Sequence, residues 1–185
     1  MNEIAWCWAW PDMNAELQVG RQVSEMFGHY RQSQGENERG GQLFVDPANP
    51  GGIVLCHASA PHPADRAGRT WLELNNDRCR TEIENANRKG LRLVGYWHTH
   101  PQAVPHISGT DIASFARFAR QNARDLPHPV AVIVGTSPST TGIKAGYFGR
   151  AGIRRQCIQH PCRGLNGPNS SRPFILHQRK KLCLK

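Results

Sequence analysis

Two histidines, His98 and His100, stand two residues apart in "GYWHTHP", at the end of an apolar run. Side chains two residues apart on a β-strand point to the same side of the sheet, so both imidazoles would face one space. Two imidazoles so placed can bind one Zn²⁺ through bonds of about 2.0–2.1 Å. Asp111, at the expected start of the next helix, can supply a third ligand. Three protein ligands leave a fourth position for water, which is typical of catalytic zinc sites.

The same residues also have an interpretation without a metal. "SGTD", from Ser108 to Asp111, fits a capping box, in which a serine and an acid three residues later cap a helix. A His-x-His pair in a strand can equally be two ordinary histidines. Both patterns meet at one strand-to-helix junction, and this coincidence favours the metal site. Asp111 could serve the helix and the metal together.

The elements that must position these residues follow from periodicity and from Gly and Pro breaks. Strands are expected at 41–46, 51–59, 91–100, 129–137 and 141–150, helices at 14–32, 76–90 and 108–126, and a loop at 60–69. The helix at 14–32 rests on Val19, Val23, Met26, Phe27 and Tyr30, which would share one helical face. The run at 129–137 is apolar on both faces, which predicts a central, buried strand. Strands and helices mix without regular alternation, so we predict an α/β domain with a mixed sheet.

The spacing His-x-His, seven residues, Ser, two residues, Asp resembles the signature of the JAMM (JAB/MPN-type) zinc metallopeptidases. "GYWHTHP" is similar to the phrase seen in prokaryotic JAB proteins. The family also places a glutamate upstream, often just before paired glycines, and "ENERGGQLFV" offers Glu38 before Gly40 and Gly41. The resemblance covers roughly residues 14–150. It departs from many relatives at Ile107, where they have a proline before the serine.

The resemblance implies a JAB/MPN-like, cytidine-deaminase-like architecture, with a mixed, curved β-sheet flanked by helices. It implies one zinc per chain, held by His98, His100 and Asp111, which would acidify a water. Glu38, rather than the nearby Glu36, would take the proton from that water and pass it to the leaving amine. Ser108 would donate a hydrogen bond to the oxyanion of the tetrahedral intermediate.

The family cleaves peptide or isopeptide bonds, commonly after the C-terminus of ubiquitin or a ubiquitin-like protein. Prokaryotic members resemble JAB peptidases encoded beside activating and conjugating enzymes, some of them in anti-phage operons. We therefore expect a ubiquitin-like protein or its conjugate as substrate, and those enzymes as partners. Three alternatives stay open: a sulfur-carrier-processing peptidase, a nucleic-acid-associated JAB-like protein that uses a basic tail, and a catalytically silent scaffold. The complete ligand set argues against the scaffold.

Charge is unevenly distributed along the 185 residues, whose net formal charge is +9. Residues 151–185 hold eight Lys and Arg and no acid, while residues 1–150 hold 15 basic and 14 acidic side chains. We therefore predict a JAB/MPN domain over 1–150 and a basic, partly disordered tail over 151–185. Nucleic acid is the less favoured partner of this tail. Because no signal peptide and no membrane span is recognisable, we expect a cytoplasmic protein without membrane partners.

Four further patterns bear on the fold and on the site. Trp6, Trp8 and Trp10 alternate, which predicts a half-buried edge strand, with a partner-binding surface as the alternative. His106 lies beside the proposed site and is interpreted as a loop residue rather than a ligand. The six scattered cysteines are expected to be mostly free thiols. A second zinc site is not favoured for the C-terminal Cys and His residues, because their spacing does not match paired zinc knuckles: Cys157, His160, Cys162, His177 and Cys183.

Overall fold

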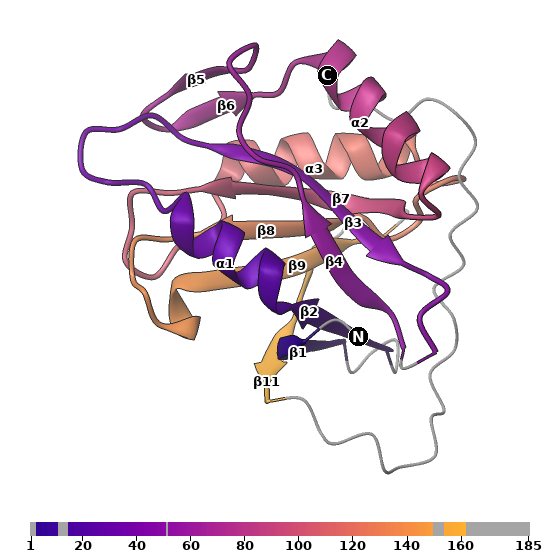
Figure 1. Cartoon of the computed structure of the whole chain (residues 1–185). Helices are drawn as coiled ribbons and strands as arrows, with labels where there is room; N and C mark the ends of the chain where they lie inside the picture. Colours follow the sequence, from indigo (N-terminus) through magenta and orange to yellow (C-terminus); the bar gives the residue numbers. More distant parts are fainter. Residues whose placement is uncertain (1–2, 11–14, 51, 150–153, 162–185) are drawn as a thin grey trace.

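The computed structural model describes residues 3–10, 15–50, 52–149 and 154–161 (Figure 1). Its strands are β1 Ile4–Trp10, β2 Ala15–Gly20, β3 Gly40–Asp46, β4 Val54–Ala58, β5 Arg66–Gly68, β6 Trp71–Glu73, β7 Arg92–Thr99, β8 Val130–Val134, β9 Ile143–Phe148, β10 Arg154–Gln156 and β11 Ile158–His160. Its helices are α1 Arg21–His29, α2 Asn76–Arg88 and α3 Gly109–Gln121, with a 3₁₀ turn at Thr140–Gly142. None of these helices has the length and apolar character needed to cross a membrane.

Nine of the described strands form one mixed sheet in the order β10-β9-β8-β7-β3-β4-β2-β1-β11. β7 pairs parallel with β8, β2 pairs parallel with β4, and the other pairs in this sheet are antiparallel. β10 pairs with β9 at one end of the order, and β11, which begins two residues after β10 ends, pairs with β1 at the other end. The sheet must therefore curl until its two ends approach one another. The prediction of a mixed, curved sheet flanked by helices is confirmed.

The helices divide between the two faces of the curved sheet (Figure 1). Val23 and Phe27 of α1 join one core cluster, which also contains the three tryptophans of β1. α2 and α3 contribute to a second cluster through residues such as Ile83 and Phe115. β7 and β8 supply side chains to both clusters, since successive residues of a strand point to opposite faces. The strand that carries the histidines is thus held from both sides.

The N-terminal part of the fold corrects two predictions. Residues 14–32 were expected to be one helix, but β2 precedes α1 there, with Leu17 and Val19 buried in strand alternation. β1 is neither half-buried nor an edge, because it lies between β2 and β11. Trp8 and Trp10 are each 1% exposed, so the alternative of a partner-binding tryptophan surface is also wrong. Burying a large side chain of this kind contributes about 1.5–3 kcal/mol.

Other predicted elements are confirmed within a few residues, with two exceptions. The loop expected at 60–69 contains β5, which forms a small two-stranded sheet with β6. β9, expected to be the last strand, is followed by β10 and β11. The proposed end of the domain at residue 150 therefore precedes two strands of the sheet, and its exact place stays a prediction.

The cysteines follow the expectation in part. Cys56, Cys79 and Cys157 form no disulfide. Cys7 is disulfide-bonded. The predictions for Cys162 and Cys183 fall outside the described residues. Of the tail predicted at 151–185, residues 154–161 are described and include β10 and β11, and the rest of it lies outside the described residues.

Candidate metal centre

The two histidines of "HTH" lie at the end of β7 with their rings on one side, as strand alternation predicts. Both are buried, and their Nε2 atoms are 3.1 Å apart. The His98 ring stacks against Phe115 of α3, with ring centroids 6.3 Å apart and an interplanar angle of 19°. The backbone of His106 forms a hydrogen bond with the His100 ring. Such contacts fix the orientation of metal-binding imidazoles in proteins.

Asp111 lies in the first turn of α3 and faces both rings. Its Oδ1 is 3.3 Å from His98 Nε2, and its Oδ2 is 3.3 Å from His100 Nε2. The capping box is also present, because Asp111 N donates to Ser108 Oγ and Ser108 N donates to Asp111 Oδ2. The two interpretations of "SGTD" therefore hold together, and the same carboxylate caps the helix and faces the histidines.

These distances fit a tetrahedral zinc site. Ligand atoms bound to Zn²⁺ at about 2.0–2.1 Å lie about 3.3 Å from one another along the edges of the tetrahedron. The two Nε2 atoms are 3.1 Å apart, and each lies 3.3 Å from a different oxygen of Asp111: Oδ1 for His98 and Oδ2 for His100. Two imidazoles and a carboxylate are also a donor set that Zn²⁺ accepts. The residues present therefore fit the ion that the sequence predicts.

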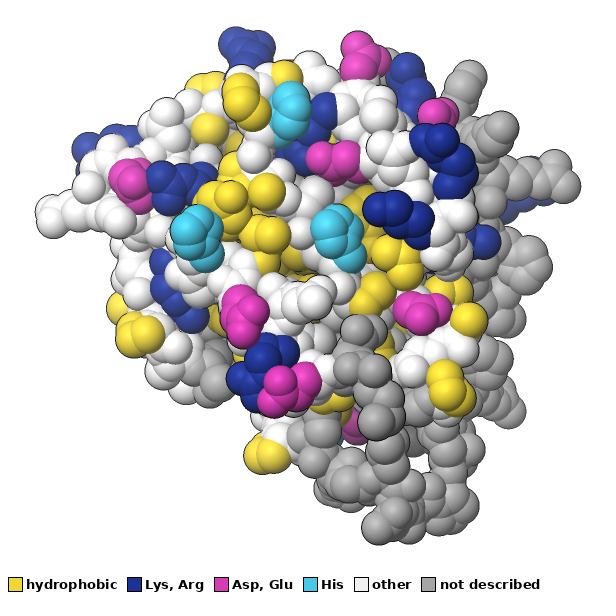
Figure 2. Space-filling view, viewed as in Figure 1, with side chains coloured by type: hydrophobic (Ala, Val, Ile, Leu, Met, Phe, Trp, Pro, Cys, Tyr) yellow, Lys and Arg dark blue, Asp and Glu magenta, His cyan; other side chains and the backbone are white. Residues whose placement is uncertain are grey.

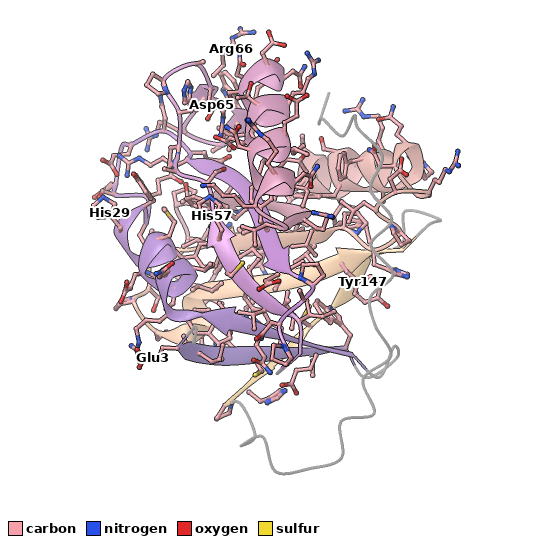
Figure 3. The ribbon with its side chains drawn as sticks, turned by 45° about the vertical axis from the view of Figure 1, so that its right-hand side comes forward. Glu3, His29, His57, Asp65, Arg66 and Tyr147 are labelled. Carbon is pink, nitrogen blue, oxygen red and sulfur yellow. The ribbon has the colours of Figure 1, made fainter. Side chains whose placement is uncertain are left out.

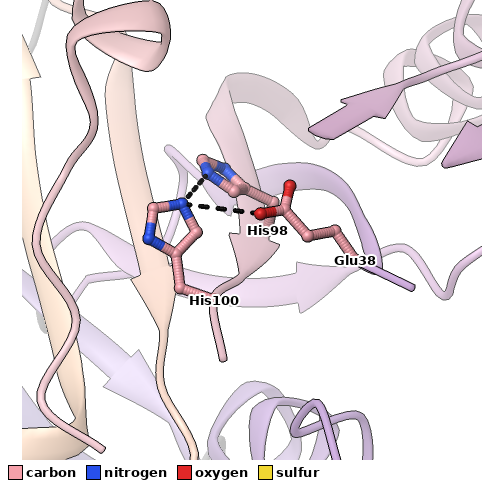
Figure 4. Close-up of side chains that lie close together, drawn as sticks. All are labelled: Glu38, His98 and His100. Carbon is pink, nitrogen blue, oxygen red and sulfur yellow. Dashed lines mark hydrogen bonds and ion pairs between the residues drawn. The ribbon is translucent and has the colours of Figure 1, made fainter. Parts of the chain in front are cut away.

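Glu38 reaches the same point from the segment before β3 (Figure 4). It is 5% exposed, and its Oε1 lies 3.8 Å from His100 Nε2. Glu38, His98 and His100 form a group whose ligand atoms all lie within 4.8 Å of one another, so Glu38 is a second candidate for the third ligand. Asp111 lies closer to both rings, which favours Asp111 as the ligand and leaves Glu38 beside the open position.

The electrostatics of the site suit these roles. Burial, aided by the negative charge of Asp111 and opposed by His100, raises the pKa of Glu38 to about 7. A carboxyl group with a pKa near neutrality can both accept and release a proton. Burial alone would raise the pKa of Asp111, but hydrogen bonds with His100, His98 and Ser108 outweigh it and hold that pKa well below its usual range. Asp111 thus stays anionic and favours positive charge between the rings.

Paired glycines bring the glutamate segment close to the histidine strand. β3 begins at Gly40, which pairs with His98. A Cβ atom on Gly40 would lie 2.3 Å from the Trp97 carbonyl oxygen, and one on Gly41 would lie 2.3 Å from the Ser59 carbonyl oxygen. Neither position can hold a larger residue without a backbone shift, and the predicted close approach is therefore present.

The structure also shows where Ser108, Glu36 and His106 lie relative to the histidine pair. Ser108 is exposed, and its hydroxyl donates to Asp111 Oδ2 at 2.6 Å. Glu36 points away from the centre, since its carboxylate accepts from Ser33 N and pairs with Arg39 Nη2 at 2.8 Å. His106 lies in the loop before α3, as expected, and is not a member of the Glu38, His98 and His100 group.

A second zinc site at the C-terminal Cys and His residues remains disfavoured. His160 Nε2 lies 3.4 Å from Glu16 Oε2, and Cys157 is half-buried and forms no disulfide. Cys162, His177 and Cys183 lie outside the described residues.

A pocket of about 210 Å³ opens beside the metal centre, between the β5–β6 hairpin and the start of α3. Its lining includes Glu38, His98 and Asp111 at one end and the exposed Trp71 and Arg117 toward solvent. On the molecular face seen in Figure 2, the coloured cationic and anionic side chains are interspersed rather than gathered into one basic patch.

Sequence reasoning missed a buried ion pair behind the pocket. Arg78 of α2 binds both oxygens of Asp65, which is labelled in Figure 3, at 2.9 and 2.7 Å, and the two side chains are 5% and 6% exposed. Arg78 also donates to Ser59 Oγ, beside β3. A single Arg in a polar helix carries no periodic signal. The spacing of residues in the sequence therefore does not indicate this ion pair.

A strand-borne histidine pair, a capping aspartate and an adjacent buried glutamate on a curved mixed sheet define a protein of the JAB/JAMM class. Residues 22–146 match the family of prokaryotic homologs of the JAB domain. This match covers well over half of the chain, and the chain therefore belongs to that family. The resemblance inferred from "HTH" and "SGTD" is confirmed.

Curated relatives carry the name CD-NTase/cGAS isopeptidase. The chain is 31% identical over 106 residues to one from Enterobacter hormaechei, covering 57% of this chain and 59% of the relative. It is 27% identical over 131 residues to one from Pseudomonas aeruginosa, covering 69% and 82% respectively. The chain thus spans less than two thirds of the length of the Enterobacter relative.

Among solved structures, a Desulfitobacterium hafniense protein matches with a TM-score of 0.50 and 16% identity, over 77% of this chain and 88% of that one. A JAB1/MPN domain protein from Archaeoglobus fulgidus matches with a TM-score of 0.44 and 14% identity, over 74% and 91%. The first of these supports the fold.

Proposed function

We propose that this chain is a zinc-dependent isopeptidase that releases a protein from its conjugate by cleaving the bond at that protein's C-terminus. The observation that carries the proposal is the convergence of His98, His100 and Asp111 at 3.1–3.3 Å, with the buried Glu38 beside them. Membership of the prokaryotic JAB family and the name of the relatives, CD-NTase/cGAS isopeptidase, support it. A CD-NTase/cGAS-type or ubiquitin-like protein is the conjugated partner we propose.

His98, His100 and Asp111 would hold one Zn²⁺. When bound, zinc supplies Lewis-acid chemistry and allows water to lose a proton near neutral pH. Glu38, with its pKa of about 7, accepts the proton of the attacking water at its carboxylate and delivers it to the leaving amine. Ser108 releases its hydrogen bond to Asp111 and donates it to the carbonyl oxygen as negative charge develops there.

The pocket beside the centre would bind the substrate. Its walls are the β5–β6 hairpin and the first turns of α3, and its inner end reaches Glu38 and His98. An extended C-terminal peptide can pair its backbone with a strand edge of the hairpin while its last carbonyl points to the metal centre. Apolar side chains such as Leu72 and Phe115 line the pocket and exclude water from the bond to be cleaved.

The test compares two neighbouring glutamates. The substrate is a CD-NTase- or ubiquitin-like protein whose C-terminus is joined to a lysine side chain, and release is followed by mass. Glu38→Gln should keep its zinc and its melting temperature and lose at least 10²-fold in turnover, in line with general acid–base catalysis. Glu36→Gln should stay within a few-fold of the parent, because its carboxylate contacts Ser33 and Arg39 instead. Full activity of Glu38→Gln, or activity that survives complete zinc removal, would refute the proposal.

A further inference from the structure

A buried glutamine links the segments that surround Glu38. Gln32 follows α1 and is 2% exposed. Its Nε2 donates to the Glu36 carbonyl oxygen at 2.7 Å and to the Arg69 carbonyl oxygen at 3.1 Å. Its Oε1 accepts from the Thr99 hydroxyl at 3.4 Å. One amide therefore joins the glutamate segment, the turn of the β5–β6 hairpin and the end of β7.

The Thr99 hydroxyl extends this link to the residue next to Glu38. Thr99 stands between His98 and His100, so its side chain points away from the metal centre, and it is fully buried. Its Oγ1 accepts from Arg39 N at 2.9 Å, and its own N donates to the Arg39 carbonyl oxygen at 2.8 Å. The strand that holds the histidines thus also holds the backbone beside Glu38.

The third attachment comes from the hairpin. Glu38 N donates to the Gly68 carbonyl oxygen at 2.8 Å, and Gly68 precedes Arg69, whose carbonyl Gln32 binds. The backbone on both sides of Glu38 is therefore tied to elements that Gln32 joins. Neither Gln32 nor Thr99 lines the pocket that is proposed to bind the substrate. Neither side chain would therefore contact the bound peptide.

We propose that Gln32 and Thr99 form a positioning pair that fixes the Glu38 carboxylate relative to the His98 and His100 rings. The inference rests on the proposed function, because it takes Glu38 as the proton-transfer group. The three metal ligands are held otherwise: the histidines by the pairing of β7 with β3 and β8, and Asp111 by the capping box. Loss of the pair therefore leaves zinc bound but displaces the base, and proton transfer is sensitive to small displacements.

The kinetic test uses the zinc-loaded enzyme and the conjugate substrate. Thr99→Val removes the hydroxyl, and Gln32→Met removes the amide. Each should retain zinc and KM and lose about 10–100-fold in kcat, as loss of supporting hydrogen bonds at a metal site does. Thr99→Ser restores the hydroxyl and should restore kcat. Ser59→Ala is the matched control, because it also removes a buried hydroxyl that accepts a hydrogen bond from a backbone amide, that of Gln42 at 2.8 Å, four residues after Glu38.

A second measurement does not depend on activity. In the zinc-free protein, Thr99→Val should speed hydrogen exchange at the Arg39 amide, because that amide loses its acceptor, while Ser59→Ala should leave it unchanged. Unchanged exchange in Thr99→Val would overturn the link.

A double variant tests whether the pair acts through Glu38. Once Glu38→Gln has removed the base, adding Thr99→Val should cause no further loss of kcat. An equal loss in both backgrounds, or a Ser59→Ala variant as slow as Thr99→Val, would overturn the inference in favour of a general structural role. Full kcat in Thr99→Val beside an inactive Glu38→Gln would refute the pair alone. A fully active Glu38→Gln would instead refute the proposed function and the pair with it.

Discussion

Removing the Asp111 carboxylate should separate its two roles, because one carboxylate caps α3 and also faces both histidine rings. In zinc-free protein, Asp111→Ala loses the capping interaction, which costs about 1 kcal/mol of unfolding free energy, together with the contacts of its carboxylate with His98 and His100. With zinc bound, the difference in unfolding free energy between the parent and Asp111→Ala grows. An ion present at about 1,000 times its dissociation constant stabilises the folded state by about 4 kcal/mol. For a chain of this size that corresponds to a rise of about 8–16 °C in Tm.

The assay is thermal unfolding with chelator and with excess zinc. The parent should show the full zinc-dependent rise, and Asp111→Ala should show little of it. Ser108→Ala is the control, since it loses the hydrogen bond from Asp111 N but no metal ligand. It should therefore lose about 1 kcal/mol with or without zinc and keep the rise. A full zinc-dependent rise in Asp111→Ala would refute Asp111 as a ligand and favour Glu38, the carboxylate that groups with His98 and His100.

Two further predictions concern the framework. Arg78→Leu leaves the Asp65 carboxylate buried without its cation, and should cost about 3–5 kcal/mol in urea unfolding; a cost below about 1 kcal/mol would show that the ion pair does not support the fold. Of two shortened chains, one ending at residue 161 keeps β10 and β11 and one ending at residue 150 does not. The chain ending at 150 should fold and bind zinc but melt at a lower temperature than the chain ending at 161, because β1 and β9 lose strand partners; equal Tm values for the two would place the end of the domain at 150.

The candidate metal centre could be predicted from the sequence because its geometry is almost entirely local. Strand alternation alone places His98 and His100 side by side, and helix-cap geometry alone turns Asp111 toward the helix start. Glu38 is remote in sequence, and spacing could not have joined it to the histidines. It was found through the paired glycines of the family resemblance, and the structure gives the reason, since Gly40 pairs directly with His98.

The failed predictions concern segments whose local sequence pattern is compatible with more than one secondary structure or strand pairing. Val19 belongs to β2 and Val23 to α1, and because the strand runs directly into the helix at Gly20, their spacing looked like one continuous helix. The alternation of Trp6 and Trp8 is the same for an edge strand and an inner strand. Only the pairing of β11 with β1, from residues some 150 positions later, makes that strand an inner one.

Gln32 and Thr99 were not predicted, although His98 and His100 on either side of Thr99 were. The reason is again that the sequence does not show which segments pack together. A histidine's chemistry is visible in its type, whereas a threonine on the opposite face of the strand gains importance only from what packs there. Here that is the backbone of Arg39, tied to Gln32 through the hydroxyl. One strand therefore presents two faces with separate tasks: His98 and His100 converge on the metal centre, and Thr99 between them holds the segment that brings Glu38 to it.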